Sequence, residues 1–276
     1  MNRLRFARTP EGAVGVVLLA FIVLVALIGP YFAGHSPSQT IGLPFDGPGH
    51  GALLGTDGLG RDALARTLWG GRSVLGLAGL ATLLAYLVGA AIGLTAGYLQ
   101  GLVDAVLMRG VDVLVGVPAL LFILVLLTGA GSGNGTLVAA VAVVQAPLIA
   151  RVVRSATLEQ SVRAFVEAAV ARGENVSAIL IREIVPNIVP SVMADAGLRL
   201  TYSIILVASV NFFGLGLQPP AADWALMISE NRDGFDLNPW VIIAPAAMIA
   251  LLTIAVNLIG DALARSLGRS DVRSGA

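Results

Sequence analysis

The side chains best suited to chemistry gather in one polar segment, residues 161–187, which lies between long apolar runs. Its charged residues include Arg163, Glu167 and Arg172 in the first half and Arg182 and Glu183 in the second. Because charges at this density stand out in an otherwise apolar chain, we expect the function to be transmitted through this segment.

The apolar residues of the segment predict two short helices joined by a glycine bend. They recur at the i, i+3, i+4, i+7 spacing of one helix face. Gly173 ends the first helix, Asn175 is a suitable cap for the second, and Pro186 ends the second. The two apolar stripes are Val162, Phe165, Val166 and Ala169, and then Val176, Ile179, Leu180 and Ile184. The sequence therefore predicts a helix, a bend and a helix lying on a membrane surface.

Several kinds of catalytic site are excluded by residue type. A phosphate-binding P-loop needs a lysine, and all seventeen basic residues are arginine. The two histidines, His35 and His50, fall in one polar loop, and the chain has no cysteine. Zinc sites, thiol nucleophiles and histidine-assisted serines within a span are therefore not expected. We predict no catalytic, metal or cofactor-binding residues and no enzymatic activity of this chain.

The composition indicates an integral membrane protein. Of 276 residues, 57% are apolar and only 12% charged, and the mean hydropathy is +0.87. The formal net charge is zero, so nothing points to nucleic acid as a partner. The lipid bilayer is the expected surrounding.

Six apolar runs are predicted to span the membrane. The first, near residues 13–32, is longer than the apolar part of a signal peptide, so an uncleaved helix is predicted there. Residues 34–72 are rich in Gly and Pro and form an outer loop. The other five runs lie near residues 73–98, 113–127, 136–149, 190–213 and 241–259.

The distribution of arginine predicts the orientation of these spans. Six spans place both termini on one side, and twelve of the seventeen arginines fall on that side. The positive-inside rule then puts both termini and the segment 161–187 in the cytoplasm. The outer loops carry four: Arg61, Arg66, Arg72 and Arg232.

Small and polar residues within the spans allow two interpretations each. Small residues recur every fourth position at Ala81, Ala85, Gly89, Gly93, Gly97 and Gly101, as expected for close helix packing or for a gate. Asp195 and Arg199 are spaced to form an ion pair, and Asn211 and Asn257 are further polar residues in spans. These four either line a translocation pathway or are structural.

Four motifs in order resemble the permease subunits of ATP-binding-cassette importers, in particular the second permease of the dipeptide, oligopeptide and nickel group. Glu167, Ala168 and Ala169, followed by Gly173 and then Pro186 and Asn187, resemble the family's cytoplasmic coupling loop. The other motifs are LGTDGLGRDALARTLWGGRSVL in the first outer loop, FFGLGLQPP at residues 212–220, and PW…NLIGDAL within residues 239–263.

The resemblance implies an all-α fold of six transmembrane helices, the transmembrane-domain fold of type I importers, in a bacterial plasma membrane. It also implies a division into an anchor helix and outer loop (1–72), a permease core (73–263) with a coupling loop (155–190), and a cytoplasmic tail (264–276). The implied partners are a second permease in a heterodimer, two ATPase subunits that use ATP and Mg²⁺, and an extracytoplasmic substrate-binding protein.

The family also implies roles for individual residues. Glu167 would anchor the coupling loop on an ATPase, Ala168 and Ala169 would allow close approach, Gly173 would permit the bend, and Phe165, Pro186 and Asn187 belong to the same loop. The binding protein would contact the outer loops, for which Asp57, Arg61, Asp62 and Trp224 are candidates.

The chain departs from the family pattern at several positions. Glu183 stands where histidine usually precedes the Pro-Asn ending, Val207 where the fifth span usually has an acidic residue, and Ala225 where glycine follows the tryptophan. We therefore do not assign to this chain any of the family's substrate contacts that depend on these positions.

Two other functions remain open from the residues alone. One is a secondary transporter or channel without an ATPase partner, which inverted repeats or broken helices around a charged midplane site would favour. The other is a noncatalytic scaffold whose charged segment is only solvated. The family resemblance favours an importer for peptides, with a nickel chelate as the next solute class.

Overall fold

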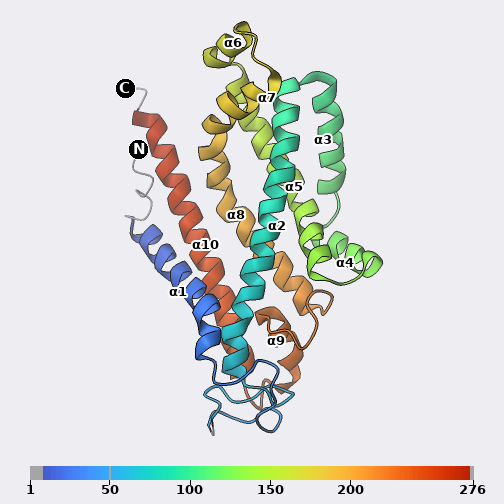
Figure 1. Cartoon of the computed structure of the whole chain (residues 1–276), viewed down its shortest axis with the longest axis vertical. Helices are drawn as coiled ribbons and strands as arrows, with labels where there is room; N and C mark the ends of the chain where they lie inside the picture. The colour runs from blue at the N-terminus through green and yellow to red at the C-terminus, as the bar shows by residue number, and fades with distance from the viewer. Residues whose placement is uncertain (1–8, 50, 274–276) are drawn as a thin grey trace.

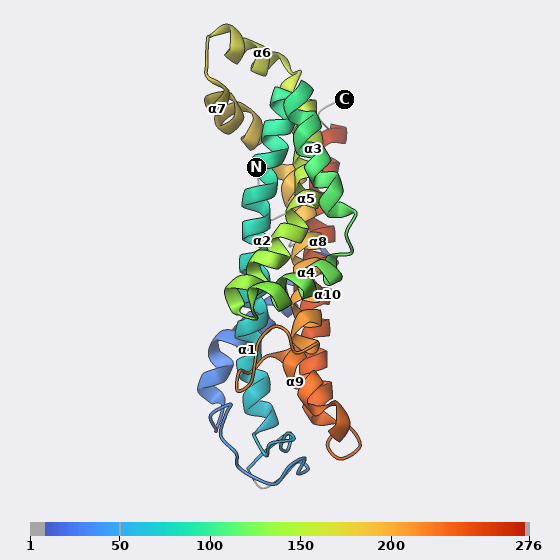
Figure 2. The same ribbon diagram turned by 90° about the vertical axis from the view of Figure 1, so that its right-hand side faces the viewer.

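The computed structural model describes residues 9–49 and 51–273 and is an elongated bundle of helices (Figures 1 and 2). In these residues, the regular structure other than helix is limited to three isolated β-bridges in loops. The helices are α1 (Pro10–Phe32), α2 (Ala63–Leu99), α3 (Gly101–Val115), α4 (Ala119–Ala130), α5 (Asn134–Ser161), α6 (Ala164–Ala171), α7 (Val176–Ala178), a π-helical turn η2 (Ile179–Ile184), α8 (Val185–Phe212), α9 (Trp224–Asn231), a 3₁₀ turn η3 (Arg232–Gly234) and α10 (Trp240–Arg273).

Five stretches are long and apolar enough to cross a membrane, namely α1, α2, α5, the continuous run α7–η2–α8, and α10. The helices α3 and α4 reach this length only as a pair, which is bent by 87°. The predicted all-α fold with six spans is confirmed if the bent pair counts as one. The arginines at positions 3, 5 and 8, used to orient the spans, lie outside the described residues, as does His50.

The third predicted span, residues 113–127, is wrong in position and shape. Helix α3 already begins at Gly101, and the break between α3 and α4 falls inside the predicted span, where Gly116 and Pro118 stand. Proline lacks the backbone N–H that continues a helix and restricts the residue before it, so a break is favoured at this point. Arg154 and Arg151 on α5 pair with Asp104 and Asp112 on α3.

The longest helix, α2, packs along α5 through the glycine stripe. A Cβ atom added at Gly89 or Gly93 would lie 2.6 Å from the carbonyl oxygen of Ala146 or Ala150, and one at Gly97 would lie 2.7 Å from Thr157 Cβ. Of the two interpretations of this stripe, close helix packing is therefore correct for these three glycines. Gly101 differs, because its added Cβ would meet nothing within 4 Å and its φ is +56°. It forms the corner between α2 and α3.

The first helix is attached to α2 by Arg72. Pro30 has no N–H to donate to the carbonyl of Ala26, and the Arg72 Nε donates to that oxygen at 2.9 Å. The same guanidinium lies 5.1 Å from the ring of Trp69 and 5.8 Å from that of Tyr31. At the other end of α1, Glu11 pairs with Arg265 of α10 at 2.6 Å.

We predict that Gly93→Ala destabilises the protein and Gly79→Ala does not. The first places a methyl group 2.6 Å from a backbone oxygen of α5, whereas the second meets open space on the same helix. Overpacking of this kind costs about 1–3 kcal/mol, and alanine at an open helical position gains about 0.5–1 kcal/mol. Thermal unfolding of the purified protein in detergent measures both. Equal midpoints for the two variants would contradict the packing described above.

Candidate functional site

The segment 161–187 forms the end of the molecule that projects beyond the long helices (Figures 1 and 2). It consists of α6, a bend at Gly173, the short α7 and the π-helical turn η2, which runs directly into α8. The prediction that Pro186 ends the second helix is wrong, because Pro186 lies in the first turn of α8, where its missing N–H is tolerated. Two spans, α5 and α8, therefore leave this segment. Through the backbone, the segment is connected to the bundle by these two helices.

The bend at Gly173 has the hydrogen bonds of a Schellman motif. The N–H of Glu174 donates to the carbonyl of Ala169 at 3.2 Å, and the N–H of Gly173 to that of Val170 at 2.9 Å. Gly173 has a φ of +77° but open space around it, so glycine is required for the conformation. Asn175 caps the second helix as predicted, because its side chain accepts from the N–H of Ala178 at 2.8 Å.

The predicted apolar stripes are correct in part. Val166, Ala169, Ile179 and Ile184 are buried in one cluster, and Phe165 packs against it. Val162 and Val176 are exposed, because Val162 lies between α5 and α6 and Val176 is the first residue of α7. Together with Val170 and Ile181 they leave an apolar surface on the outside of the segment. Exposed apolar surface with charges around it is typical of a contact with another protein.

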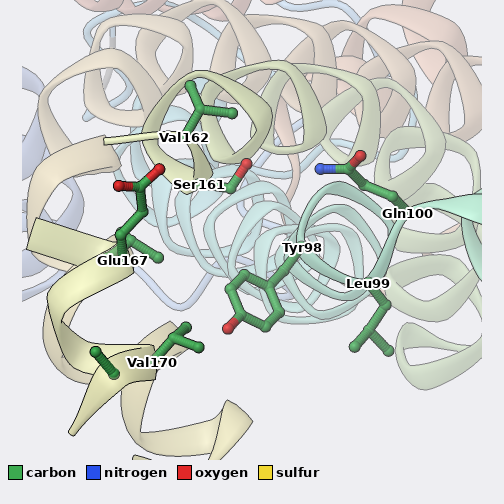
Figure 3. Close-up of a pocket in the computed structure, with 9 residues that line it drawn as sticks. Tyr98, Leu99, Gln100, Ser161, Val162, Glu167 and Val170 are labelled. Atoms are coloured by element: carbon green, nitrogen blue, oxygen red, sulfur yellow. The ribbon is translucent and has the colours of Figure 1, made fainter. Parts of the chain in front are cut away.

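Glu167 and Ala168 are exposed on this surface. Glu167 lines a pocket of about 540 Å³ between α6 and the end of α2, together with Tyr98, Gln100 and Val170 (Figure 3). In the described part of the chain, no group donates a hydrogen bond to the Glu167 carboxylate. Gln100 has a φ of +53°, which is unfavourable for a residue with a side chain, and strain of this kind clusters at functional sites.

Glu183, the departure from the family pattern, takes part in an ion pair. Arg172 at the end of α6 contacts Glu174 at 2.6 Å and Glu183 at 3.6 Å. The contact between Arg172 and Glu183 joins the end of α6 to η2 across the bend at Gly173. The Asn187 side chain donates to the carbonyl of Glu183 at 2.6 Å, at the transition from the π-helical turn to α8.

The four polar residues predicted within spans do not form one group. Arg199 Nε pairs with Asp195 Oδ2 at 2.9 Å, and Tyr86 donates to the same carboxylate at 3.1 Å. Asn257 accepts from Thr201 at 2.9 Å. Asn211 is fully buried and accepts from the N–H of Leu217, so it shapes the turn after α8. A role of these residues in translocation stays a prediction.

The opposite end of the molecule is a subdomain made of residues 33–49, 51–62 and 213–239, which we call the outer subdomain after the orientation predicted from the arginines. It is built on a buried charge network in which Arg66 contacts Asp57 at 2.6 Å and Glu230 at 2.8 Å, and Arg61 contacts the same two residues. Asn238 donates to the carbonyl oxygens of Asp46, Leu54 and Thr56 and so joins the two loops.

The candidates for contact with a binding protein all lie inside this subdomain. Asp57 and Trp224 are fully buried, and Arg61 and Asp62 are 4% exposed. Trp224 donates to the carbonyl of Thr67 at 2.8 Å, and Asp62 caps α2 and accepts His35 at 2.9 Å. Their contact with another protein stays a prediction, and in this structure they support the outer surface from beneath.

Two carboxyl groups here have shifted pKa values in opposite directions. Burial alone raises the pKa of Asp57, but the backbone N–H groups of Arg61 and Leu59 and the Arg66 guanidinium outweigh it and hold the pKa below the ordinary value. For Asp223, burial dominates and raises the pKa, although Ser73 and the first N–H groups of α9 donate to it. Within the described residues, no group of three metal-binding side chains occurs.

The buried hydrogen bonds that join α2, α5 and α8 were not predicted from the sequence. Gln145 on α5 donates to Arg199 and Ser203 on α8, and Ser203 also contacts Thr82 on α2. The sequence feature that could have indicated these bonds is the single glutamine within the apolar run 136–149.

Comparison with known proteins gives a consistent result. Residues 89–270 match the family described as "binding-protein-dependent transport system inner membrane component", and residues 3–46 match the "N-terminal TM domain of oligopeptide transport permease C". The chain is 38% identical to a glutathione transport system permease protein of Pectobacterium atrosepticum over 80% of this chain and 74% of that protein. It is 33% identical to a Brucella abortus protein whose name assigns it to peptide permeases, over 94% of this chain and 87% of that protein.

The fold is similar to that of a solved transporter. A chain of the MetNI methionine ABC transporter, in an inward-facing conformation, superposes with a TM-score of 0.58 at 17% identity. The match covers 74% of this chain and 96% of that chain.

We predict that Arg66→Gln destabilises the outer subdomain and that Arg232→Gln does not. Removing Arg66 leaves the buried Asp57 carboxylate with Arg61 as its one remaining ionic partner and takes a partner from Glu230. Breaking a buried ion pair costs up to about 3–5 kcal/mol. The Arg232 side chain is 69% exposed, and its one ion pair among the described residues is with Asp233 at 3.6 Å, so its replacement changes stability by less than about 0.5 kcal/mol. Protease cleavage of residues 33–62 from the outer side of membrane vesicles measures the difference. Equal cleavage rates would show that the network is not needed.

Proposed function

Since the chain belongs to the family of binding-protein-dependent transport system inner membrane components, we propose that it moves di- or oligopeptides across the membrane in an ATP-driven importer. Family membership makes it a multi-pass permease subunit of an ABC transporter in the bacterial inner membrane. The observation that carries the proposed mechanism is the projecting segment 161–187, whose side chains Val162, Val170, Val176 and Ile181 are exposed and whose Glu167 carboxylate accepts no hydrogen bond within the described chain.

The segment is proposed to receive motion from a separate ATPase subunit. Glu167 and Ala168 are exposed for this contact, Ala169 and Phe165 pack the segment onto the bundle, and Gly173 holds the bend. Pro186 and Asn187 form the junction with α8. Closure of the ATPases on ATP and Mg²⁺ would displace α6 and thereby shift the equilibrium between inward-facing and outward-facing states.

The remaining partners follow from surfaces that the chain leaves uncovered. A second permease would cover apolar side chains such as Leu83 and Leu87 on α2 and complete the pathway as a heterodimer. A substrate-binding protein would dock on the outer subdomain, supported from beneath by Asp57, Arg61, Asp62 and Trp224. Two ATPase subunits would supply nucleotide hydrolysis, because this chain lacks the lysine of a P-loop.

The solute class is proposed from the relatives. Their names point to glutathione and peptides, and glutathione is itself a small peptide.

Asp195, Arg199 and Asn257 are proposed to lie along the pathway, and Asn211 to support its outer end. We also propose that residues 1–72, 73–263 and 264–276 act as anchor and outer loop, permease core and cytoplasmic tail. A secondary transporter is disfavoured because the chain belongs to a family of binding-protein-dependent transport components.

Gly173→Val is expected to lower binding-protein-stimulated ATP hydrolysis by the assembled complex at least several-fold. A β-branched residue at a φ of +77° is strained by roughly 1–3 kcal/mol, and asparagine tolerates this region better. Gly173→Asn is therefore expected to retain most of the stimulation. Because open space surrounds Gly173, the pair tests backbone conformation alone. Equal stimulation in both variants would exclude the bend as a mechanical element.

Peptides are expected to stimulate ATP hydrolysis only when presented by the binding protein. The test adds the cognate binding protein, loaded either with glutathione or a dipeptide or with a nickel chelate, to the complex in nanodiscs. Stimulation by the loaded peptide supports the proposed solute class. Stimulation confined to the nickel chelate would replace it.

A further inference from the structure

Gln145 is a buried polar side chain at the middle of the bundle that the mechanism above does not use. Only 2% of its surface is exposed. Its Nε2 donates to the carbonyl oxygen of Arg199 at 2.9 Å and to Ser203 Oγ at 3.2 Å, both on α8. An amide in an apolar surrounding is unfavourable unless it is hydrogen-bonded. An apolar side chain could fill the same space, so packing alone does not account for a glutamine here.

The bonds of Gln145 join the two helices that leave the projecting segment. Along α5, Gln145 lies sixteen residues before Ser161, or roughly 24 Å. Along α8, Arg199 lies fourteen residues after Val185, or roughly 21 Å. The segment connects α5 and α8 at one end and Gln145 connects them at the other. α5 and α8 are therefore connected at two places, by the segment at their ends and by Gln145 at a similar distance along each helix.

An apolar cluster lies between these elements and α2. Its buried members include Ile149 and Val153 from α5, Val166 and Ala169 from α6, Ile179, Ile184 and Ile188 from η2 and α8, and Ala85 from α2. These side chains are closely packed and transmit displacement among themselves. The hydrogen bonds of Gln145 add a directional connection between α5 and α8.

Each of the two helices contains a proline between the segment and the Gln145 contact, at which it could bend separately. Pro147 lies in α5 between Gln145 and the segment, and Pro190 lies in α8 between the segment and Arg199. A proline inside a helix removes one backbone hydrogen bond and allows a kink. Bending at one of these prolines would absorb part of a displacement of α6. Contacts beyond the prolines, among them the bonds of Gln145, limit this loss.

We propose that Gln145 is a positioning residue that makes α5 and α8 move as one body when the projecting segment is displaced. The inference rests on the proposed function, since it describes how ATP-driven motion would reach the spans. Ser203 extends the connection to α2, because its Oγ lies 2.8 Å from Thr82 Oγ1.

The first test measures solute imported per ATP hydrolysed in vesicles that contain the whole complex. Gln145→Met keeps a similar length and volume but removes the two donors. We expect this ratio to fall at least about fivefold, with unchanged amounts of assembled complex. Ser203→Ala, which leaves the bond to the Arg199 carbonyl, is expected to cause a smaller fall. Ser209→Ala is the matched control, since that hydroxyl bonds only to Ile205 of its own helix.

The second test measures a distance and does not depend on import. This chain has no native cysteine, so Ala139→Cys on α5 and Ile205→Cys on α8 place one pair of spin labels on it. Both sites are exposed and lie beyond the two prolines as seen from the segment. In the otherwise wild-type complex, the label distance is expected to be the same in nucleotide-free and ATP-trapped states. With Gln145→Met, ATP trapping is expected to change or broaden it.

Two results would overturn the proposal: a wild-type label distance that changes on ATP trapping, or a Gln145→Met complex with the wild-type ratio of solute to ATP. Absence of ATP-driven import by the wild-type complex would instead refute the proposed function. In that case the label distance would still show whether α5 and α8 move together.

Discussion

The backbone contact between α2 and α5 at Gly89, Gly93 and Gly97 is the constraint on which the rest of the structure depends. Lipid is as apolar as a leucine side chain, so helices in a bilayer are held together by close packing and polar bonds. The three glycines permit an approach that any Cβ would prevent. Because α2 begins in the outer subdomain and ends beside the Glu167 pocket, this contact joins both ends of the molecule to the helix that carries the projecting segment.

The two ends of the molecule are stabilised by different interactions. The outer subdomain is held by buried ions whose removal would leave uncompensated charge, with Asp57 between Arg61 and Arg66. The projecting segment is held by apolar packing and by exposed ion pairs such as Arg172 with Glu174, which contribute little. The first end is suited to remain rigid under a docked protein. The second is suited to move with a partner.

The sequence was sufficient for features determined by local chemistry. The Gly173 bend, the Asn175 cap and the Asp195–Arg199 pair depend on neighbours within a few residues, and all three form. The third span was wrong, because hydropathy does not detect the 87° break near Pro118. Burial of Asp57 and Trp224 could not be predicted either, since it depends on loops more than 150 residues apart. The contacts of Gln145 require the three-dimensional proximity of α5 and α8.

The central claim is that ATP hydrolysis by partner subunits drives solute movement through this chain. It is tested most directly by the initial rate of entry of a labelled peptide into vesicles that contain the assembled transporter and an external binding protein. The account predicts entry with nucleotide on the side of the segment 161–187 and none with an ion gradient alone. Entry driven by the gradient without ATP would contradict it and identify a secondary transporter.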